Sequence, residues 1–133
     1  MNAVFADTSY YAALFNRGDV NHLAALELSG ELASPIVTTE FVLLELGNAY
    51  CRVPTRRRYV GLVESLRGGL CDLITPASHE LFDKGLGLFA QREDKEWSVT
   101  DCISFVVMRE RGIVEALTAD HHFEQAGFRI LLK

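Results

Sequence analysis

Two aspartates directly follow predicted buried strands. In "VFADTSYYAALF" (residues 4–15) an apolar stretch turns polar at Asp7, and apolar residues then resume at helical spacing. Asp120 follows an apolar stretch in the same way in "EALTADHHF". In an open parallel sheet, functional sites form beyond the carboxyl ends of the strands, so both carboxylates are expected at one edge. Each could also serve only as the N-cap of the helix after it.

Two further acids lie on predicted helices. Asp101, in "WSVTDCISFVVM", stands three residues after Ser98, and the pair could form a capping box at a helix N-terminus. Glu45 lies in the mostly apolar helical segment "FVLLELG", where a charged residue needs either a solvent-facing position or a partner. Helix N-termini stabilise the charged form of a carboxylate. Taken singly, each acid has a structural explanation, but together the four could converge, ionised, on one crevice.

Such a cluster of carboxylates suits a hard divalent cation. All-oxygen sites bind Mg²⁺ or Mn²⁺ rather than zinc. These ions polarise a phosphodiester, lower the pKa of a bound water and stabilise the attacking and leaving oxygens. The sequence offers no convincing Ser-His-Asp or Cys-His set and no phosphate-binding loop of the nucleotide-binding type. The pattern therefore predicts metal-dependent hydrolysis of a phosphodiester.

Histidines are not expected to hold the metal. His121 and His122 follow Asp120 directly, but adjacent residues of a helix point to different sides. His22 and His79 share no ligand spacing with them.

Strand and helix signals alternate along the chain, which predicts an α/β fold, a three-layer α/β/α sandwich with a mostly parallel central sheet. Residues 1–133 are expected to form a single domain. The strand candidates are 3–6, 34–39, 70–75, 114–119 and 128–132. The helix candidates are 9–16, a segment ending at about 32, 40–53, 55–67, 78–92, 99–111 and a single turn at 121–127. Asp19 or Asn21 can cap the second helix, and Thr39 can cap the third, which Pro54 is expected to stop. Gly68-Gly69 is expected to end the fourth. Gly85 and Gly87 in the long helix are expected to allow close packing.

Composition indicates an ordinary globular protein. Of 133 residues, 49% are hydrophobic and 23% charged, and no apolar run approaches the roughly 20 residues that span a bilayer. Three scattered cysteines and the lack of a signal peptide favour reduced thiols and the cytoplasm. The net charge of −5 argues against a nucleic-acid partner, but four metal-bound carboxylates would remove most of it. Five arginines also cluster within residues 52–67, either as a solvated helix face or as a contact for phosphate.

Four motifs, in this order, resemble the PIN-domain family, and particularly the VapC-type ribonuclease toxins of prokaryotic toxin–antitoxin pairs. They are "VFADTSYYAALFNRGDVNH", "VTTEFVLLELGNAY", "WSVTDCISFVVMRERGI" and "ALTADHHFEQAGFRILL", and the likeness runs nearly end to end. It implies a PIN-like fold and an endoribonuclease that depends on Mg²⁺ or Mn²⁺. Carried over by position, it assigns catalysis and metal binding to Asp7, Glu45, Asp101 and Asp120.

The resemblance also suggests residues around the metal ligands. Some relatives carry a further acid two residues before the final aspartate, and Thr118 stands there in this chain. A hydroxyl binds a metal or its water only weakly, which puts a tightly held second ion in question. Other candidates for contact with the site or with RNA are Thr8, Ser9 and Ser104, and Arg52, which is expected two turns beyond Glu45 on the same helical face.

Partners follow from the resemblance as well. Such toxins usually form homodimers, and an antitoxin of the VapB type holds them inactive by covering the acidic crevice with its C-terminal segment. The apolar, arginine-flanked helices around 41–67 are the expected docking surface for that segment. RNA is the expected substrate, and no membrane association is expected.

Other classes of protein remain open at this point. A catalytically silent PIN-like module could bind RNA or a protein without cleaving it. A haloacid-dehalogenase-like phosphatase would use Asp7 as nucleophile, but it needs an acid where Ser9 stands and a phosphate-binding lysine. A phospho-acceptor signalling domain also needs a lysine near the last strand, and Lys133 comes too late.

Overall fold

The computed structural model describes residues 2–132 and contains one parallel sheet. Its strand order is β3-β2-β1-β4-β5, and every neighbouring pair runs parallel. The expected α/β fold is confirmed, and the sheet is parallel throughout rather than mostly so. The strands are β1 (Val4–Ala6), β2 (Ile36–Thr39), β3 (Leu73–Thr75), β4 (Glu115–Leu117) and β5 (Arg129–Ile130).

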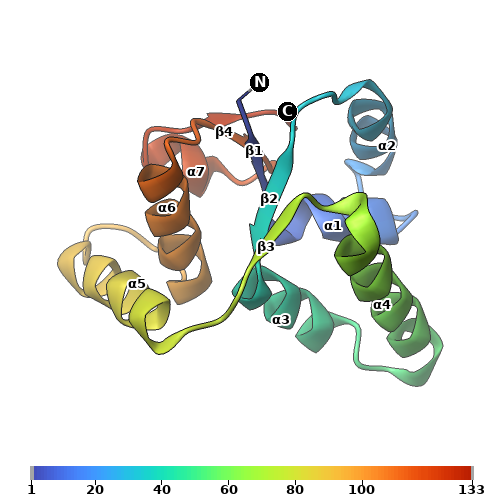
Figure 1. The fold of residues 1–133 in the computed structure, drawn as a ribbon, viewed down its shortest axis with the longest axis horizontal. Coiled ribbons are helices and arrows are strands. Elements are labelled where there is room, and N and C mark those ends of the chain that lie inside the picture. The colour runs from blue at the N-terminus through green and yellow to red at the C-terminus, as the bar shows by residue number, and fades with distance from the viewer. Residues whose placement is uncertain (1, 133) are drawn as a thin grey trace.

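Helices cover the sheet on both sides, as the alternation of elements predicts. Figure 1 shows α5, α6 and α7 on one side of the strands and α1, α2 and α4 on the other, with α3 beyond the carboxyl ends of the central strands. The helices are α1 (Thr8–Phe15), α2 (His22–Glu31), α3 (Glu40–Ala49), α4 (Val53–Ser65), α5 (His79–Gln91), α6 (Val99–Arg111) and α7 (His121–Gln125), and an irregular turn η1 (Leu66–Leu70) follows α4. No helix within residues 2–132 is both long and apolar enough to cross a membrane.

The core is centred on β1, all three of whose residues are buried. Phe105 of α6 contacts Trp97 and Phe123 edge-on, with ring centroids 5.0 and 4.9 Å apart. Buried aromatic side chains of this size contribute a large share of the apolar area removed from water, and edge-to-face pairs add about 0.5–1.5 kcal/mol each. This aromatic cluster fixes α6 and α7 against the central strands, and with them the residues at the start of both helices.

The boundary between α3 and α4 differs from the prediction. Helix α3 ends at Ala49, and Pro54 lies in the first turn of α4 instead of stopping α3. Proline lacks only an N–H that the first helical turn leaves unpaired, so it suits this position. Arg52 is therefore the N-cap residue of α4, and its expected place two turns along the helix of Glu45 is wrong. The predicted end near Gly68-Gly69 is confirmed, because Gly69 has φ +121°.

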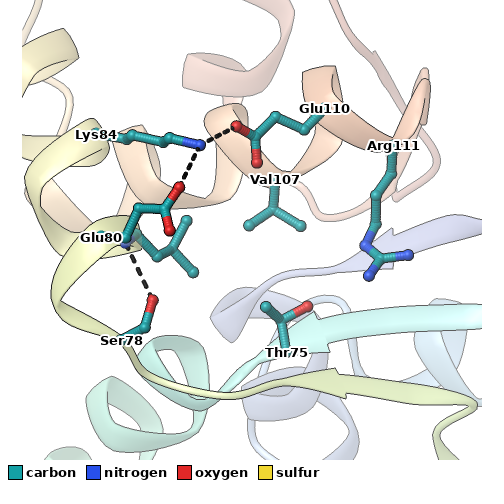
Figure 2. Close-up of a pocket in the computed structure, with 8 residues that line it drawn as sticks. Thr75, Ser78, Glu80, Lys84, Val107, Glu110 and Arg111 are labelled. Carbon is teal, nitrogen blue, oxygen red and sulfur yellow. Dashed lines mark hydrogen bonds and ion pairs between the residues drawn. The ribbon is translucent and has the colours of Figure 1, made fainter.

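The packing of α5 on α6 depends on one glycine. A Cβ atom at Gly85 would lie 2.3 Å from Cγ1 of Ile103, so only a hydrogen fits between the two helices. Gly87 has open space around it, and the expectation of close packing there is wrong. Next to this contact, β3, α5 and α6 enclose a cavity of about 210 Å³ (Figure 2). Lys84 spans it, with its Nζ 3.2 Å from Glu80 Oε1 and 2.7 Å from Glu110 Oε2.

Candidate metal centre

Asp7 is the N-cap residue of α1 and is only 4% exposed. Its Oδ2 accepts hydrogen bonds from the Thr118 hydroxyl at 2.9 Å and from the Ser9 hydroxyl at 3.1 Å. The two hydroxyl oxygens are themselves 2.8 Å apart. Two polar neighbours thus hold one carboxylate oxygen, and neither carries a charge.

Strand register explains this contact across the chain. Ala6 of β1 lies beside Leu117 of β4, so the next residues, Asp7 and Thr118, leave the sheet together. The Asp7 N–H extends the ladder by donating to the Leu117 carbonyl at 3.2 Å. Thr118 also accepts the Asp120 N–H at 3.0 Å, which links the first and last acidic motifs.

The environment of Asp7 disfavours its charge in the absence of a cation. Burial is the main cause, and the negative charge of Asp101 adds to it, so that the pKa of the Asp7 carboxyl is raised to about 6. The hydrogen bonds from Thr118 and Ser9 act in the opposite direction and are too weak to cancel the shift. Asp7 is therefore a buried carboxylate beside another acid.

Asp101 is fixed at the start of α6 by the predicted capping box. The Ser98 hydroxyl accepts the Asp101 N–H at 3.0 Å, and Asp101 Oδ2 accepts the Ser98 N–H at 3.1 Å. Burial raises the pKa of the Asp101 carboxyl, the Ser98 N–H opposes this, and the charge of Asp120 raises it further. Asp101 can therefore cap α6 and still lie beside the other aspartates.

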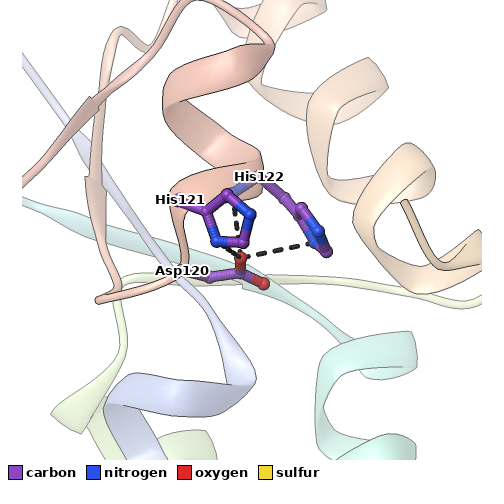
Figure 3. Close-up of side chains that lie close together, drawn as sticks. All are labelled: Asp120, His121 and His122. Carbon is purple, nitrogen blue, oxygen red and sulfur yellow. Dashed lines mark hydrogen bonds and ion pairs between the residues drawn. The ribbon is translucent and has the colours of Figure 1, made fainter. Parts of the chain in front are cut away.

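Asp120 is the N-cap of α7, and its Oδ1 accepts the His122 N–H at 2.9 Å. The His122 ring lies between two of the acids, with Nδ1 3.3 Å from Asp120 Oδ1 and 3.3 Å from Asp101 Oδ2. The sequence interpretation missed this residue. The expectation that the adjacent histidines point to different sides is also wrong, because the rings of His121 and His122 are 4.5 Å apart and both approach Asp120 (Figure 3).

Glu45 stands apart from the three aspartates. It lies half-buried on α3, a helix that packs against both α1 and α6. Within residues 2–132 it makes no hydrogen bond or ion pair, and no three of the four predicted acids have ligand oxygens within 4.8 Å of one another. The structure therefore couples Asp7 to Asp101 and Asp101 to Asp120 through charge, whereas Glu45 shares no hydrogen bond with them and contributes to neither pKa shift.

Of the other residues predicted to lie near the site, two hydrogen-bond to an aspartate through their side chains and three do not. Ser9 and Thr118 contact Asp7 directly. The hydroxyls of Thr8 and Ser104 are buried without a hydrogen-bond partner in the described part of the chain. Arg52 is exposed at the start of α4.

The residues present fit a hard divalent cation. The four acids offer only oxygen donors, the ligand type that Mg²⁺ and Mn²⁺ prefer. Among residues 2–132, no lysine or arginine pairs with Asp7, Asp101 or Asp120, and the only basic side chains near them are the imidazoles of His121 and His122. A cation would relieve the repulsion that raises the pKa values of Asp7 and Asp101.

Comparison with known proteins agrees with this geometry. The pattern of the PIN domain matches residues 4–129, and the chain belongs to the PIN-domain family. Within that family it is similar to the 23S rRNA-specific endonuclease VapC20 of Mycobacterium tuberculosis, with 30% identity over 125 residues, 94% of this chain and 95% of that protein. The expected resemblance to VapC-type toxins is thereby confirmed.

Solved structures show the same likeness. The crystal structure of M. tuberculosis VapC20, described as a toxin that cleaves the sarcin–ricin loop, superposes with a TM-score of 0.88 at 28% identity, covering 98% of this chain and 99% of that one. VapBC from Salmonella typhimurium, bound to DNA, gives a TM-score of 0.67 at 14% identity and 98% coverage of both chains. The second likeness shows the fold alone.

Proposed function

We propose that this protein is a metal-dependent endoribonuclease of the VapC type, the toxin of a toxin–antitoxin pair. The observation that carries the proposal is the charge-coupled set of Asp7, Asp101 and Asp120 at the carboxyl ends of β1 and β4 and the start of α6. Burial raises the pKa of Asp7 and of Asp101, and the charge of a neighbouring aspartate adds to each shift. Neither carboxyl has a lysine or arginine partner in the described residues, which favours a cation as the missing neighbour. Residues 1–133 would act as one domain.

The metal would be held by the carboxylates of Asp7, Glu45, Asp101 and Asp120. When bound, Mg²⁺ or Mn²⁺ supplies Lewis-acid polarisation of the phosphodiester and a more acidic water. Glu45 is the ligand with the most freedom, since nothing in residues 2–132 hydrogen-bonds it. It would complete the site when the cation arrives.

The chain's own contribution is to orient the carboxylates beforehand. Thr118 and Ser9 occupy Oδ2 of Asp7, which leaves Oδ1 available to a cation. The Ser98 N–H holds Oδ2 of Asp101, and the His122 N–H holds Oδ1 of Asp120. Ligands held by neighbouring hydrogen bonds lose less freedom on binding a metal. Thr8 and Ser104 would contribute only as polar neighbours, and exposed Arg52 would contact RNA phosphate.

The substrate would be RNA, and we extend this to ribosomal RNA. VapC20 is named for its action on 23S rRNA, and this chain is 30% identical to it over 94% of its length. RNA cleavage and the reduced cysteines expected from the sequence would suit a protein of the cytoplasm.

The antitoxin would bind beside α4, within the expected surface at 41–67. An apolar groove of about 390 Å³ runs between α1, α2 and α4, with Leu14, Leu62 and Leu66 in its walls. The arginines at 56 and 57 are exposed on the same helix. An amphipathic segment with acidic residues would match this surface in both polarity and charge.

A homodimer would use the outer face of α5. Phe82, Leu86 and Phe89 recur at helical spacing and are 41–43% exposed. Their side chains share one face of the helix, and a second copy would cover them. Light scattering of the wild type and of Phe82→Ser tests this interface.

Cleavage of a labelled 23S rRNA sarcin–ricin hairpin tests the main proposal. We expect cleavage with Mg²⁺ or Mn²⁺, none with EDTA, and none by Asp101→Asn. Cleavage retained by Asp101→Asn would reveal a contaminating nuclease or a different site. RNA binding without cleavage in either metal would favour the silent PIN-like module instead. Growth arrest on induction, relieved by co-expression of an adjacent antitoxin gene, tests the biological role separately.

A further inference from the structure

Asp120, His121 and His122 form the tightest group of potential metal ligands within residues 2–132. One ligand atom from each lies within 4.8 Å of the other two. Figure 3 shows both imidazole rings turned toward the same carboxylate oxygen. That oxygen, Asp120 Oδ1, lies 3.7 Å from His121 Nδ1 and 3.3 Å from His122 Nδ1.

These distances fit tetrahedral coordination. Zinc binds histidine nitrogen and carboxylate oxygen at about 2.0–2.2 Å, and neighbouring ligands of a tetrahedron with such bonds lie about 3.3–3.6 Å apart. The two separations from Asp120 Oδ1 lie at or just beyond this range. The two imidazole nitrogens lie within 4.8 Å of each other, so rotations of the two rings would bring all three ligands into this geometry. A water would fill the fourth position.

The donor set also selects the class of ion. Two imidazole nitrogens and one carboxylate suit zinc, nickel or cobalt, whereas Mg²⁺ takes oxygen donors. The group is accessible, because the side chain of His121 is 69% exposed while those of His122 and Asp120 are 22% and 28% exposed. An ion can enter from solvent and meet two partly buried ligands.

We propose that Asp120, His121 and His122 bind one zinc-class transition ion, and that this ion withdraws Asp120 from the nuclease site. Asp120 Oδ1 already faces both imidazoles, so an ion bound there would take up the charge of this carboxylate and weaken its hold on a Mg²⁺ ion at the other oxygen. Zinc would therefore inhibit RNA cleavage in the presence of excess Mg²⁺. This second part rests on the nuclease function proposed above, whereas the binding itself does not.

Co²⁺ is a spectroscopic substitute for zinc and tests the binding directly. We expect the full chain to bind one Co²⁺ with the visible absorption of a four-coordinate ion, and Zn²⁺ to displace it. His121→Ala should weaken this binding at least tenfold, and His122→Ala should do the same. His79→Ala is the matched control, because His79 is an exposed histidine paired with Asp83 at 3.1 Å on another helix. Wild-type affinity in both His121→Ala and His122→Ala would overturn the proposal.

Inhibition is measured separately. With Mg²⁺ in excess, Zn²⁺ should inhibit cleavage by the wild type and by His79→Ala, and at least tenfold more Zn²⁺ should be needed for His121→Ala. Because His121 lies 3.7 Å from Asp120, the inhibition of each variant is expressed relative to its own cleavage rate without Zn²⁺. Equal inhibition of wild type and His121→Ala would refute the link to Asp120. An absence of any Mg²⁺-dependent cleavage, together with the expected Co²⁺ spectra, would refute only the nuclease function.

Discussion

The end of the β1–β4 pair and the middle of α3 each carry an acid of the proposed site, but the surroundings of the two acids differ. At the strand ends, Asp7 is 4% exposed and accepts hydrogen bonds from Ser9 and Thr118. On α3, Glu45 is half-buried and has no partner in the described residues. Strand β1, paired with its neighbours, fixes the backbone before Asp7 and helix α1 fixes it after, whereas a long side chain on a helix keeps more of its rotamers.

This difference suggests a division of labour. At the strand ends of the proposed site, Asp7 is already oriented by hydrogen bonds before any ion binds, in surroundings that disfavour its charged form. In the proposed site, Glu45 of α3 would be a ligand that no hydrogen bond within residues 2–132 holds in place before the ion binds. Replacing residues in the two regions should therefore change different measured quantities.

The largest expected effect is on cleavage by Asp7→Asn. Removing this carboxylate should lower the rate about 10³-fold, in line with losing one main electrostatic contact in an active site. Single-turnover cleavage of the hairpin measures it. Exposed Asp83→Asn is the control and should cleave normally. A loss below tenfold for Asp7→Asn would contradict the assignment of Asp7.

The second expected effect is on how the free energy of unfolding depends on pH. Because the pKa of Asp7 rises from 3.8 to about 6 on folding, the native state binds more protons than the unfolded state between these values. Metal-free stability should therefore fall as pH rises from 4 to 6, by up to about 3 kcal/mol at neutral pH. Urea unfolding in EDTA checks this, and Asp7→Asn should flatten the profile and be more stable at pH 7. Mg²⁺ should bind more weakly below pH 6, since it competes with the Asp7 proton.

Thr118→Val tests the hydroxyl that holds Asp7. The change leaves the Asp120 N–H without its acceptor and removes one donor to Asp7, so the free energy of unfolding should fall by about 1–2 kcal/mol. Thr118→Ser keeps the hydroxyl and should stay within about 0.5 kcal/mol of wild type. Equal unfolding midpoints for the valine and serine variants would remove Thr118 from this role.

Glu45→Gln examines the other region. Since Glu45 makes no hydrogen bond or ion pair in the described residues, the free energy of unfolding of this variant should stay close to that of the wild type. The Mg²⁺ concentration at half-maximal cleavage should rise about tenfold, a change of about 1.4 kcal/mol. A loss of stability similar to that of Thr118→Val would abolish the proposed contrast between the regions.

The smallest effect is expected from Arg52→Ala. An exposed arginine that contacts one phosphate should weaken RNA binding two- to threefold, about 0.5 kcal/mol, and reduce its salt dependence. Binding isotherms at several salt concentrations measure this. Arg56→Ala on the same helix is the matched comparison, and an identical response of both variants would reduce Arg52 to part of a general basic surface.

Local features of the fold were predictable from the sequence. The caps at Thr39 and Ser98 and the αL glycine at Gly112 depend on the residues beside them, and the structure contains each one. The prediction that Pro54 stops the helix of Glu45 was wrong. Proline can follow the end of one helix or stand in the first turn of the next, and no sequence signal distinguished these two positions. The strand ends placed Asp7 and Asp120 at one edge because a parallel sheet requires it.

Contacts made between elements were harder to predict. His122 reaches Asp101 only because the aromatic cluster of Phe105 and Phe123 sets α7 against α6. The available signal was a histidine two residues after a capping aspartate, in the first turn where it can reach that carboxylate. The lack of a partner for Glu45 also depends on how α3 packs, which periodicity does not specify.

The contact of Gly85 with α6 connects α5 to the position of Asp101. Ile103, against which it packs, is two residues from Asp101 on the same helix, so a methyl group at position 85 would push α6 and tilt that carboxylate. A random mutagenesis survey should find that position 85 accepts almost no substitution, while Gly87 accepts many. Loss-of-function alleles of this toxin would then accumulate at a residue that has no side chain and touches no substrate.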